Sequence, residues 1–254
     1  MSRLIERLEK LHERTPAPMG FGAPSRKAPS ERSMLIIGET TLTKLSRLTK
    51  ANKLNLDALV IKIKPGDEDK ISSKAKSLEG FIWGASASKF ENDIDKLKEA
   101  GCDFVVFDSN LTPASVINDP DLGKFLNVSE EINENSASAI HELPIDGTVF
   151  NPKSCSPLTV DDIIHIQKIG GKFCKISVVE INETITLEDI SAIRETGTHI
   201  LKLDASGSYI SELAQHLDHL PTRRDRKKNK TDIIPQIPSA PSFSSGLEDD
   251  GHDH

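Results

Sequence analysis

The sequence predicts one (β/α)8 barrel of the TIM type, in the α/β class, with an N-terminal helix before it and a disordered C-terminal tail after it. The 254 residues match the ~250 that one such barrel occupies. Short apolar runs typical of strands alternate eight times with stretches of helical periodicity. The alternative is an open, doubly wound sheet, but no G-x-G-x-x-G follows any of these runs.

The chain divides into three parts. Residues 1–32 contain an amphipathic helix and then an irregular linker rich in proline and glycine, and we expect the helix to cover the amino-terminal end of the barrel. The barrel occupies residues 33–220. Residues 221–254 are basic, then rich in proline and serine, then acidic, so they have too few apolar residues to offset the entropy of ordering. The apolar stripe of the first helix has four members: Leu4, Ile5, Leu8 and Leu11.

Within the barrel, runs rich in β-branched and aromatic residues predict the eight strands. They are Met34–Glu39, Ala58–Lys64, Gly80–Ala85, Asp103–Asp108, Lys124–Val128, Asp146–Asn151, Lys172–Val179 and His199–Asp204.

Helical periodicity follows each strand, most weakly over Pro113–Leu122, where Pro120 interrupts the pattern. Thr186 and Asp189 form a capping box at the start of the seventh helix. Three glycines stand where helices are expected to end: Gly101, Gly170 and Gly197. The expected helices are Thr41–Asn52, Asp67–Ser77, Lys89–Ala100, Pro113–Leu122, Glu134–Leu143, Val160–Ile169, Leu187–Glu195 and Tyr209–Leu220.

The composition narrows the classes of partner that the protein is expected to bind. A formal net charge of −7 gives no electrostatic footprint for nucleic acid or an anionic membrane. Three cysteines without paired spacing indicate reduced thiols, and no apolar run approaches the ~18 residues of a membrane span, so we expect a cytoplasmic protein. The scattered histidines lack the spacing of a catalytic metal site, so no metal is expected. A small-molecule ligand is expected, and cofactor and oligomeric state stay open.

Barrel enzymes place their active sites at the carboxyl ends of the strands. The alternation of side chains turns Lys62, Lys202, Asp204 and Asp108 toward the barrel axis, and Glu39 ends the first strand. Lys175 lies on the seventh strand, either face of which could turn inward. Three acids then oppose three amines: Glu39, Asp108 and Asp204 against Lys62, Lys175 and Lys202.

Two interpretations of these charges stay open. In an active site, burial would lower the pKa of Lys62 toward neutrality, so that it serves as a Schiff-base amine or a general base while a carboxylate shuttles protons. In the structural interpretation, the same charges form an ion network that only closes the barrel mouth. Lys153, after the sixth strand, is a further amine candidate on a loop that is expected to be solvated.

Ser206, Gly207 and Ser208 follow the eighth strand, where barrels that take phosphorylated substrates commonly bind the phosphate. They are therefore candidate ligand-binding residues. The alternative is an ordinary turn with a serine N-cap. The preceding acidic loop, residues 180–183, would repel an anion.

The stretch Ala100–Ser109 places alanine and glycine before a buried strand and aspartate and serine after it. It resembles the corresponding strand of aldolase-type barrels, including flavin-dependent and inosine-monophosphate-dehydrogenase-like ones, in which the strand-end aspartate approaches a nucleotide. The resemblance implies the aldolase-type fold and adds weight to Asp108. The glycine-rich phosphate loops and the catalytic cysteine loop of those families have no counterpart here.

The sequence thus predicts a small-molecule enzyme of the aldolase-type barrel class, a lyase or isomerase that uses lysine and carboxylate chemistry. The alternative is a non-catalytic barrel that binds a ligand or a protein partner.

Overall fold

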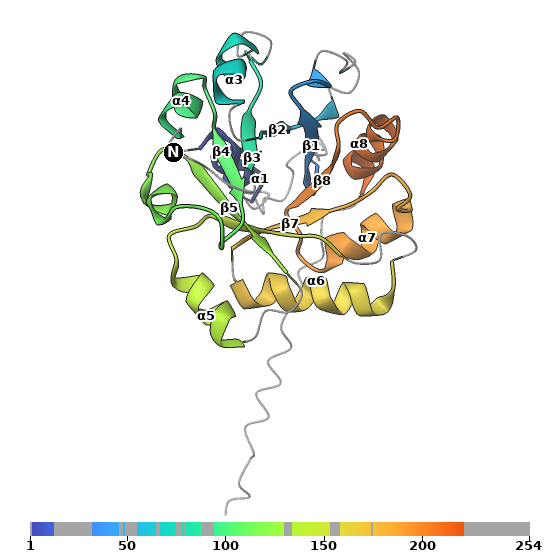
Figure 1. The fold of residues 1–254 in the computed structure, drawn as a ribbon. Coiled ribbons are helices and arrows are strands. Elements are labelled where there is room, and N and C mark those ends of the chain that lie inside the picture. The colour runs from blue at the N-terminus through green and yellow to red at the C-terminus, as the bar shows by residue number, and fades with distance from the viewer. Residues whose placement is uncertain are drawn as a thin grey trace, which may run out of the picture. The chain divides into compact units, whose positions relative to one another are not determined.

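The computed structural model describes residues 2–12, 32–45, 48, 55–64, 67–74, 78, 80–87, 94–129, 134–152, 158–173 and 175–220. Within them, eight parallel strands close into a barrel in chain order (Figure 1). The predicted (β/α)8 fold is confirmed. The strands are β1 (Leu35–Thr41), β2 (Ala58–Lys62), β3 (Trp83–Ala87), β4 (Phe104–Phe107), β5 (Gly123–Val128), β6 (Gly147–Phe150), β7 (Ile176–Glu180) and β8 (Ile200–Asp204).

Helices surround this barrel between successive strands. They are α3 (Glu68–Lys74), α4 (Ile94–Glu99), the 3-10 helix η3 (Ala114–Asn118), α5 (Glu134–Glu142), α6 (Val160–Phe173), α7 (Leu187–Glu195) and α8 (Ile210–His219), with α1 (Arg3–His12) preceding the barrel. None of the described helices has the length and apolar character needed to cross a membrane. The tail at 221–254 and half of the residues of the helix expected over 41–52 lie outside the described residues. In the described half, Thr41 still belongs to β1 and residues 42–44 form a turn, so no helix begins at Thr41.

The local signals at the helix ends were correct in all but one place. The capping box of Thr186 and Asp189 is present, and Gly101 and Gly197 have φ of +87° and +91°. Pro120 limits the fourth connection to the short 3-10 helix η3. Gly170 is not a C-cap, because α6 continues for three more residues and buries Phe173, which is 1% exposed. The seventh strand therefore starts at Ile176 and not at Lys172.

The core has two layers, one on each face of the barrel wall. The outward-facing strand residues pack beneath the helices. The inward-facing ones form a second cluster, which includes Val60 and Val106 as the alternation predicted. That cluster fills the barrel with Leu35, Ile37, Ala58, Val60, Phe104, Val106, Phe125, Val149, Val178 and Ile200.

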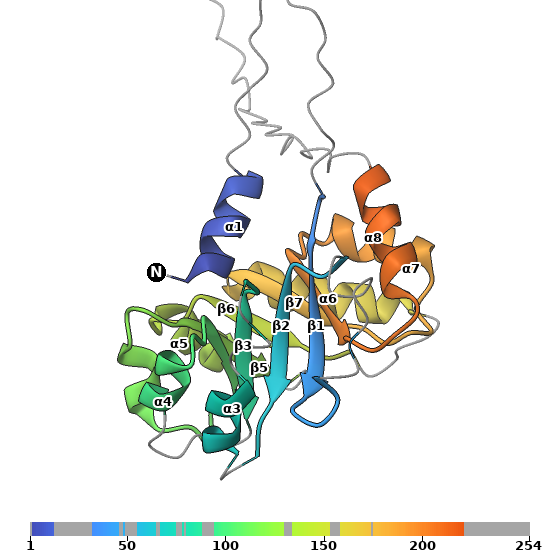
Figure 2. The same ribbon diagram turned by 90° about the horizontal axis from the view of Figure 1, so that it is seen from above.

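The helix α1 closes the amino-terminal end of the barrel, beside the starts of the strands (Figure 2). Leu4 and Leu8 are 0% and 2% exposed and belong to the same cluster as the inward-facing strand residues. The buried carboxylate of Asp103 caps the helix, because it accepts the N–H groups of Arg3 at 2.8 Å and Leu4 at 3.0 Å and the hydroxyl of Ser2 at 2.7 Å.

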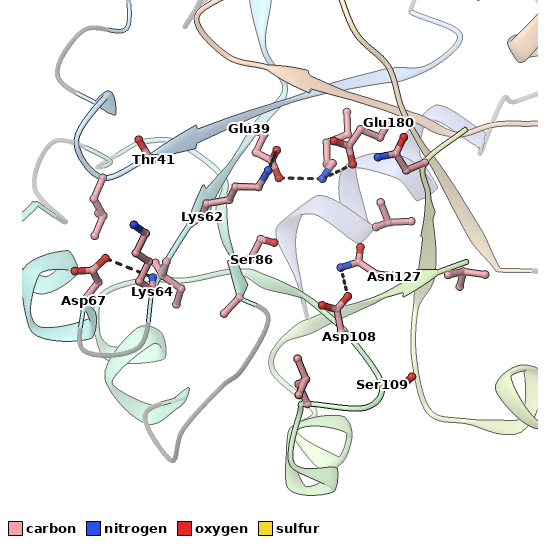
Figure 3. Close-up of a pocket in the computed structure, with 18 of the residues that line it drawn as sticks. Glu39, Thr41, Lys62, Lys64, Asp67, Ser86, Asp108, Ser109, Asn127 and Glu180 are labelled. Atoms are coloured by element: carbon pink, nitrogen blue, oxygen red, sulfur yellow. Dashed lines mark hydrogen bonds and ion pairs between the residues drawn. The ribbon is translucent and has the colours of Figure 1, made fainter. Parts of the chain in front are cut away.

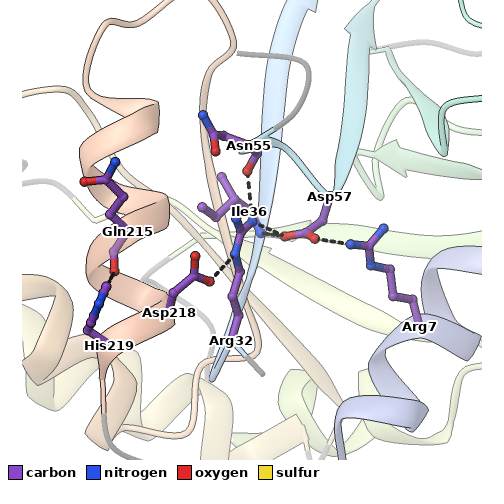
Figure 4. A network of polar contacts seen from close by, with 8 residues as sticks. All are labelled: Arg7, Arg32, Ile36, Asn55, Asp57, Gln215, Asp218 and His219. Carbon is purple, nitrogen blue, oxygen red and sulfur yellow. Dashed lines mark hydrogen bonds and ion pairs between the residues drawn. The ribbon is translucent and has the colours of Figure 1, made fainter. Parts of the chain in front are cut away.

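A second buried carboxylate ties α1 to the opposite side of the barrel. Asp57 bonds Arg7 of α1 at 2.5 Å and lies 3.5 Å from Arg32, which in turn bonds Asp218 of α8 at 2.7 Å (Figure 4). The expected docking of the N-terminal helix is confirmed, and it leaves the carboxyl ends of the strands uncovered by this element.

Candidate functional site

A cavity of about 1240 Å³ opens at the carboxyl ends of the strands. Each of the eight strands contributes an inward-facing residue to the wall of the cavity, either from the strand itself or from the position directly after it. In order around the barrel these residues are Glu39, Lys62, Ser86, Asp108, Asn127, Val149, Glu180 and Lys202. The cavity is therefore a product of the closed sheet itself and not of one long loop.

Four charged residues on one side of the cavity form a continuous ion chain (Figure 3). Lys202 is 6% exposed, and its Nζ lies 2.9 Å from Glu39 Oε1 and 3.0 Å from Glu180 Oε2. Glu39 reaches Lys62 with its other oxygen, at 2.6 Å. The ion chain Lys62–Glu39–Lys202–Glu180 joins β2, β1, β8 and β7, and its two positive and two negative charges balance.

The ion chain sets the protonation state of Lys62. Partial burial alone would lower the pKa of Lys62, but the hydrogen bond and charge of Glu39, with the charges of Glu180 and Asp204, outweigh burial and raise that pKa above its ordinary value of 10.5. The expectation of a pKa lowered toward neutrality is wrong, because that argument counted burial and not the adjacent carboxylate. Lys62 is an ammonium group at neutral pH.

Asp108 stands apart from the ion chain. It follows β4, is half-buried, and its Oδ1 accepts a hydrogen bond of 2.8 Å from the side-chain amide of Asn127 on β5 (Figure 3). No ion pair among the described residues includes Asp108. A neutral amide thus fixes this carboxylate while leaving its charge uncompensated by a bonded cation.

Asp204 lies on the same face of β8 as Lys202 but one step further out, and it is not among the described residues that line the cavity. Its Oδ1 accepts the N–H of Ser206 at 2.8 Å and the hydroxyl of Ser206 at 2.5 Å, and its Oδ2 lies 3.6 Å from Lys44. Partial burial would raise the pKa of Asp204, but the hydrogen bonds from Ser206 and the charge of Lys44 outweigh it and lower that pKa.

The three candidate phosphate-binding residues lie in the loop that follows β8, directly after Asp204 and Ala205 in the chain. Ser206, Gly207 and Ser208 do not appear in the described lining of the cavity. Two donors of Ser206 are already bonded to Asp204, so they point to a carboxylate of the protein.

Lys175 does not belong to the charged ring. Its Nζ donates to the backbone carbonyl groups of Leu143 at 2.6 Å and Ile145 at 2.7 Å, at the amino-terminal end of the barrel. The inward face of β7 carries Ile176, Val178 and Glu180, so Lys175 precedes the strand and projects elsewhere. Lys153 lies outside the described residues.

Three polar residues of the eight that the strands contribute to the cavity wall were missed in the sequence: Ser86, Asn127 and Glu180. Asn127 follows Phe125 by two positions, so an inward assignment of the fifth strand would have found it. Glu180 follows Val178 in the same way, but the face of the seventh strand was left open. Over the part of the chain that the structure describes, no group of three or more histidine, cysteine, aspartate or glutamate residues is arranged to hold a metal ion.

Comparison with known proteins shows the fold class. No family model and no curated protein matches the sequence. The solved structures that are similar include 3-keto-L-gulonate-6-phosphate decarboxylase from Vibrio cholerae, with 15% identity, a TM-score of 0.58, and coverage of 74% of this chain and 96% of that one. A mutant tryptophan synthase alpha-subunit from Pyrococcus furiosus has 8% identity and a TM-score of 0.56, over 74% of this chain and 97% of that one. For 3-hexulose-6-phosphate synthase from Salmonella typhimurium the values are 11% and 0.52, over 73% and 97%. At these identities the likeness concerns the fold alone: the chain has the TIM-barrel fold that these structures share.

Proposed function

We propose that the chain is an enzyme of lyase or isomerase type that acts on a small carbonyl compound by acid–base chemistry in this cavity. One observation carries the proposal. The ammonium group of Lys62 and the carboxylate of Asp108 line the same cavity from β2 and the end of β4, and they are not bonded to each other. An acid and a base held apart in one cavity are what proton transfer at a substrate requires.

The roles follow from the charges. Asp108 accepts a proton from the carbon beside the substrate carbonyl, and the electron pair moves onto the carbonyl oxygen. The ammonium of Lys62 donates a hydrogen bond to that oxygen and stabilises its developing negative charge. In an α-hydroxy carbonyl compound, the hydroxyl group gives its proton to the former carbonyl oxygen and Asp108 returns its proton to the former carbonyl carbon, which gives the isomer. In a lyase reaction, Asp108 instead accepts the proton of a β-hydroxyl group, the bond between the α and β carbons breaks, its electron pair passes to the carbonyl oxygen, and Asp108 then protonates the α carbon.

Acid–base chemistry is favoured over Schiff-base chemistry because Lys62 is held as an ammonium ion. Lys62 has a raised pKa, and a Schiff base needs a free amine. Lys202 is bonded to two carboxylates and almost fully buried. In the proposed enzyme it is a positioning residue that holds Glu39, and through Glu39 it fixes the position of Lys62.

The comparisons support a carbonyl substrate only by analogy of fold, because barrels host many reactions. One similar structure is named for a keto-gulonate 6-phosphate and another for a hexulose 6-phosphate.

We place the reaction in the cytoplasm, where thiols stay reduced. Burial raises the pKa of the Cys102 thiol to about 12, which leaves it protonated and inert.

The proposal is tested by hydrogen exchange at carbon. The full-length protein is incubated in D2O with a panel of hydroxyketones, keto acids and their phosphate esters, and loss of the proton beside the carbonyl is followed by proton NMR. We expect exchange on at least one compound, with a rate that falls by about 100-fold or more in Asp108→Asn and in Lys62→Met. Lys168→Gln on the exposed face of α6 is the control and should exchange as the unmodified protein does.

Saturable binding of a panel compound with no exchange at any pH would contradict the enzyme. That result would favour a non-catalytic barrel that binds a ligand, in which the ion chain serves only to close the mouth.

A further inference from the structure

We infer that the cavity binds the anionic group of its ligand at the rim formed by β1 and β2, and not in the loops after β7 and β8. This oxyanion rim is defined by Thr41, Thr43, Lys64 and Lys70. The ligand class is a small carbonyl compound that carries a phosphate or carboxylate group. The inference rests on the proposed function in one respect, that the cavity takes a small molecule.

The side of the mouth at β7 and β8 is unsuited to an anion because carboxylates already occupy it. Asp204 takes two donors of Ser206, and its lowered pKa keeps it ionised at neutral pH. The carboxylate of Glu183 lies directly against Gly207, and Glu180 ends β7. A phosphate placed there would have to displace Asp204 from the donors of Ser206 and would lie beside the carboxylate of Glu183, while the nearby Lys202 and Lys44 are already paired with Glu180 and Asp204.

The oxyanion rim has the opposite character. Lys64 directly follows β2, and Lys70 reaches the cavity from α3. Three acids separate them in the sequence: Asp67, Glu68 and Asp69. Asp67 lines the cavity; its carboxylate lies 2.7 Å from Lys70 Nζ and accepts the backbone N–H of Lys64 at 3.4 Å. The hydrogen bond from Lys70 is the main reason that the pKa of Asp67 is lowered. Lys70 is thus paired with Asp67, whereas the ammonium group of Lys64 has no ion-pair partner among the described residues and can meet a ligand.

Hydroxyl groups complete the set of donors. Thr41 ends β1 and Thr43 follows it, both line the cavity, and their Oγ1 atoms are 3.0 Å apart. One hydroxyl of such a pair donates to the other and leaves the second proton for a ligand oxygen. Charge-assisted bonds from lysine and neutral bonds from threonine are donors that a phosphate or carboxylate accepts.

The rim is also placed correctly for the proposed reaction. Lys64 is two residues beyond Lys62 on the same stretch of chain, so an anion at the rim lies one step outside the ammonium that would meet the carbonyl oxygen (Figure 3). From there the ligand extends past Ser86 on β3 toward Asp108 at the end of β4.

Binding of inorganic phosphate, and separately of acetate, to the 15N-labelled full-length protein tests the inference. Titration followed by amide chemical shifts should show saturable changes at Thr41, Thr43 and Lys64, with Ser206 and Ser208 unmoved. A response to phosphate alone would indicate a phosphate ester as the ligand, and a response to both anions would admit a carboxylate.

The double variant Lys64→Gln, Lys70→Gln should weaken phosphate binding by about tenfold or more. The double variant Lys10→Gln, Lys168→Gln removes the same charge from exposed sites on α1 and α6 and should bind phosphate as the unmodified protein does. Saturable shifts centred on Ser206–Ser208, no saturable shift, or equal weakening in both double variants would overturn the inference.

Asp108→Asn separates this inference from the proposed reaction. It should abolish exchange at carbon and leave phosphate binding unchanged. If no compound exchanges but phosphate still binds at the oxyanion rim, the reaction is wrong and the rim stands. If exchange occurs and phosphate binds nowhere on the rim, only the rim is wrong.

Discussion

At the scale of single residues, Lys62 and Lys202 hold equivalent positions in the sequence pattern, since both are inward-facing lysines near the end of a strand. Their surroundings nevertheless predict different contributions to the free energy of unfolding. Both ammonium groups bond Glu39, at 2.6 Å and 2.9 Å. The side chain of Lys62 is 56% exposed, whereas that of Lys202 is 6% exposed and has a second carboxylate partner in Glu180. Water can replace the partner of the first lysine but not those of the second.

The substitution Lys202→Met should therefore destabilise the fold much more than Lys62→Met. Without Lys202, Glu180 loses its ion-pair partner and Glu39 keeps only the exposed Lys62, so we expect a loss of about 3–5 kcal/mol in the free energy of unfolding. Without Lys62, Lys202 still neutralises Glu39, and we expect a loss of at most about 1 kcal/mol. Urea denaturation measures both, and equal losses would contradict the distinction drawn between the two lysines.

The same residues show what the sequence could predict of the site. Four of its five catalytic candidates, Glu39, Lys62, Asp108 and Lys202, line the cavity, because side chains of a strand alternate strictly and the apolar partners of each lysine and aspartate identify its face. Asp204 shares the inward face of its strand with Lys202 but is not among the described residues that line the cavity. Depth along the barrel axis depends on the stagger between strands, which the residues of one strand do not encode.

At the scale of an element, α1 was predictable in position as well as in type. The helical stripe required a partner, and the amino-terminal end of a barrel is the surface nearest to the start of the chain. The capping of α1 by Asp103 was not predictable. Asp103 directly precedes β4 and lies 99 positions after Leu4 in the chain, so no local sequence pattern relates the two residues. The prediction that Gly170 ends α6 was wrong because a tertiary contact overrides a local signal. The burial of Phe173 outweighs the low helix propensity of the two glycines before it.

The docking of α1 predicts a large effect of Leu8→Asp. Leu8 is 2% exposed among inward-facing strand residues, so an aspartate there places an unpaired charge in an apolar contact. We expect the free energy of unfolding to fall by about 2 kcal/mol or more. Glu9→Gln, at the exposed neighbouring position, should leave it unchanged. An unaltered midpoint for Leu8→Asp in thermal denaturation would show that α1 contributes nothing to the stability of the barrel.

At the scale of the whole molecule, the interior of the barrel is filled unevenly by its strands. The rings of Phe104 on β4 and Phe125 on β5 meet edge to face inside the barrel, with centroids 5.6 Å apart and planes at 75°. The flanking strands supply glycine at the matching inward positions, Gly84 on β3 and Gly147 on β6. The sequence contains all four residues, but only closure of the sheet shows that the glycines leave room for the rings.

This complementarity predicts opposite signs for the same substitution at two glycines. A Cβ on Gly84 would lie 2.5 Å from the carbonyl oxygen of Phe104 and 2.6 Å from its ring, so Gly84→Ala should force the ring or the strand to move and cost about 1–3 kcal/mol of stability. A Cβ on Gly171 of α6 would meet no atom within 4 Å, so Gly171→Ala should stabilise the protein by up to about 1 kcal/mol through its higher helix propensity. Urea denaturation of the two variants side by side measures the difference. A neutral Gly84→Ala would mean that the interior of the barrel has free volume beside Phe104, and it would contradict the close packing of Gly84 against that ring.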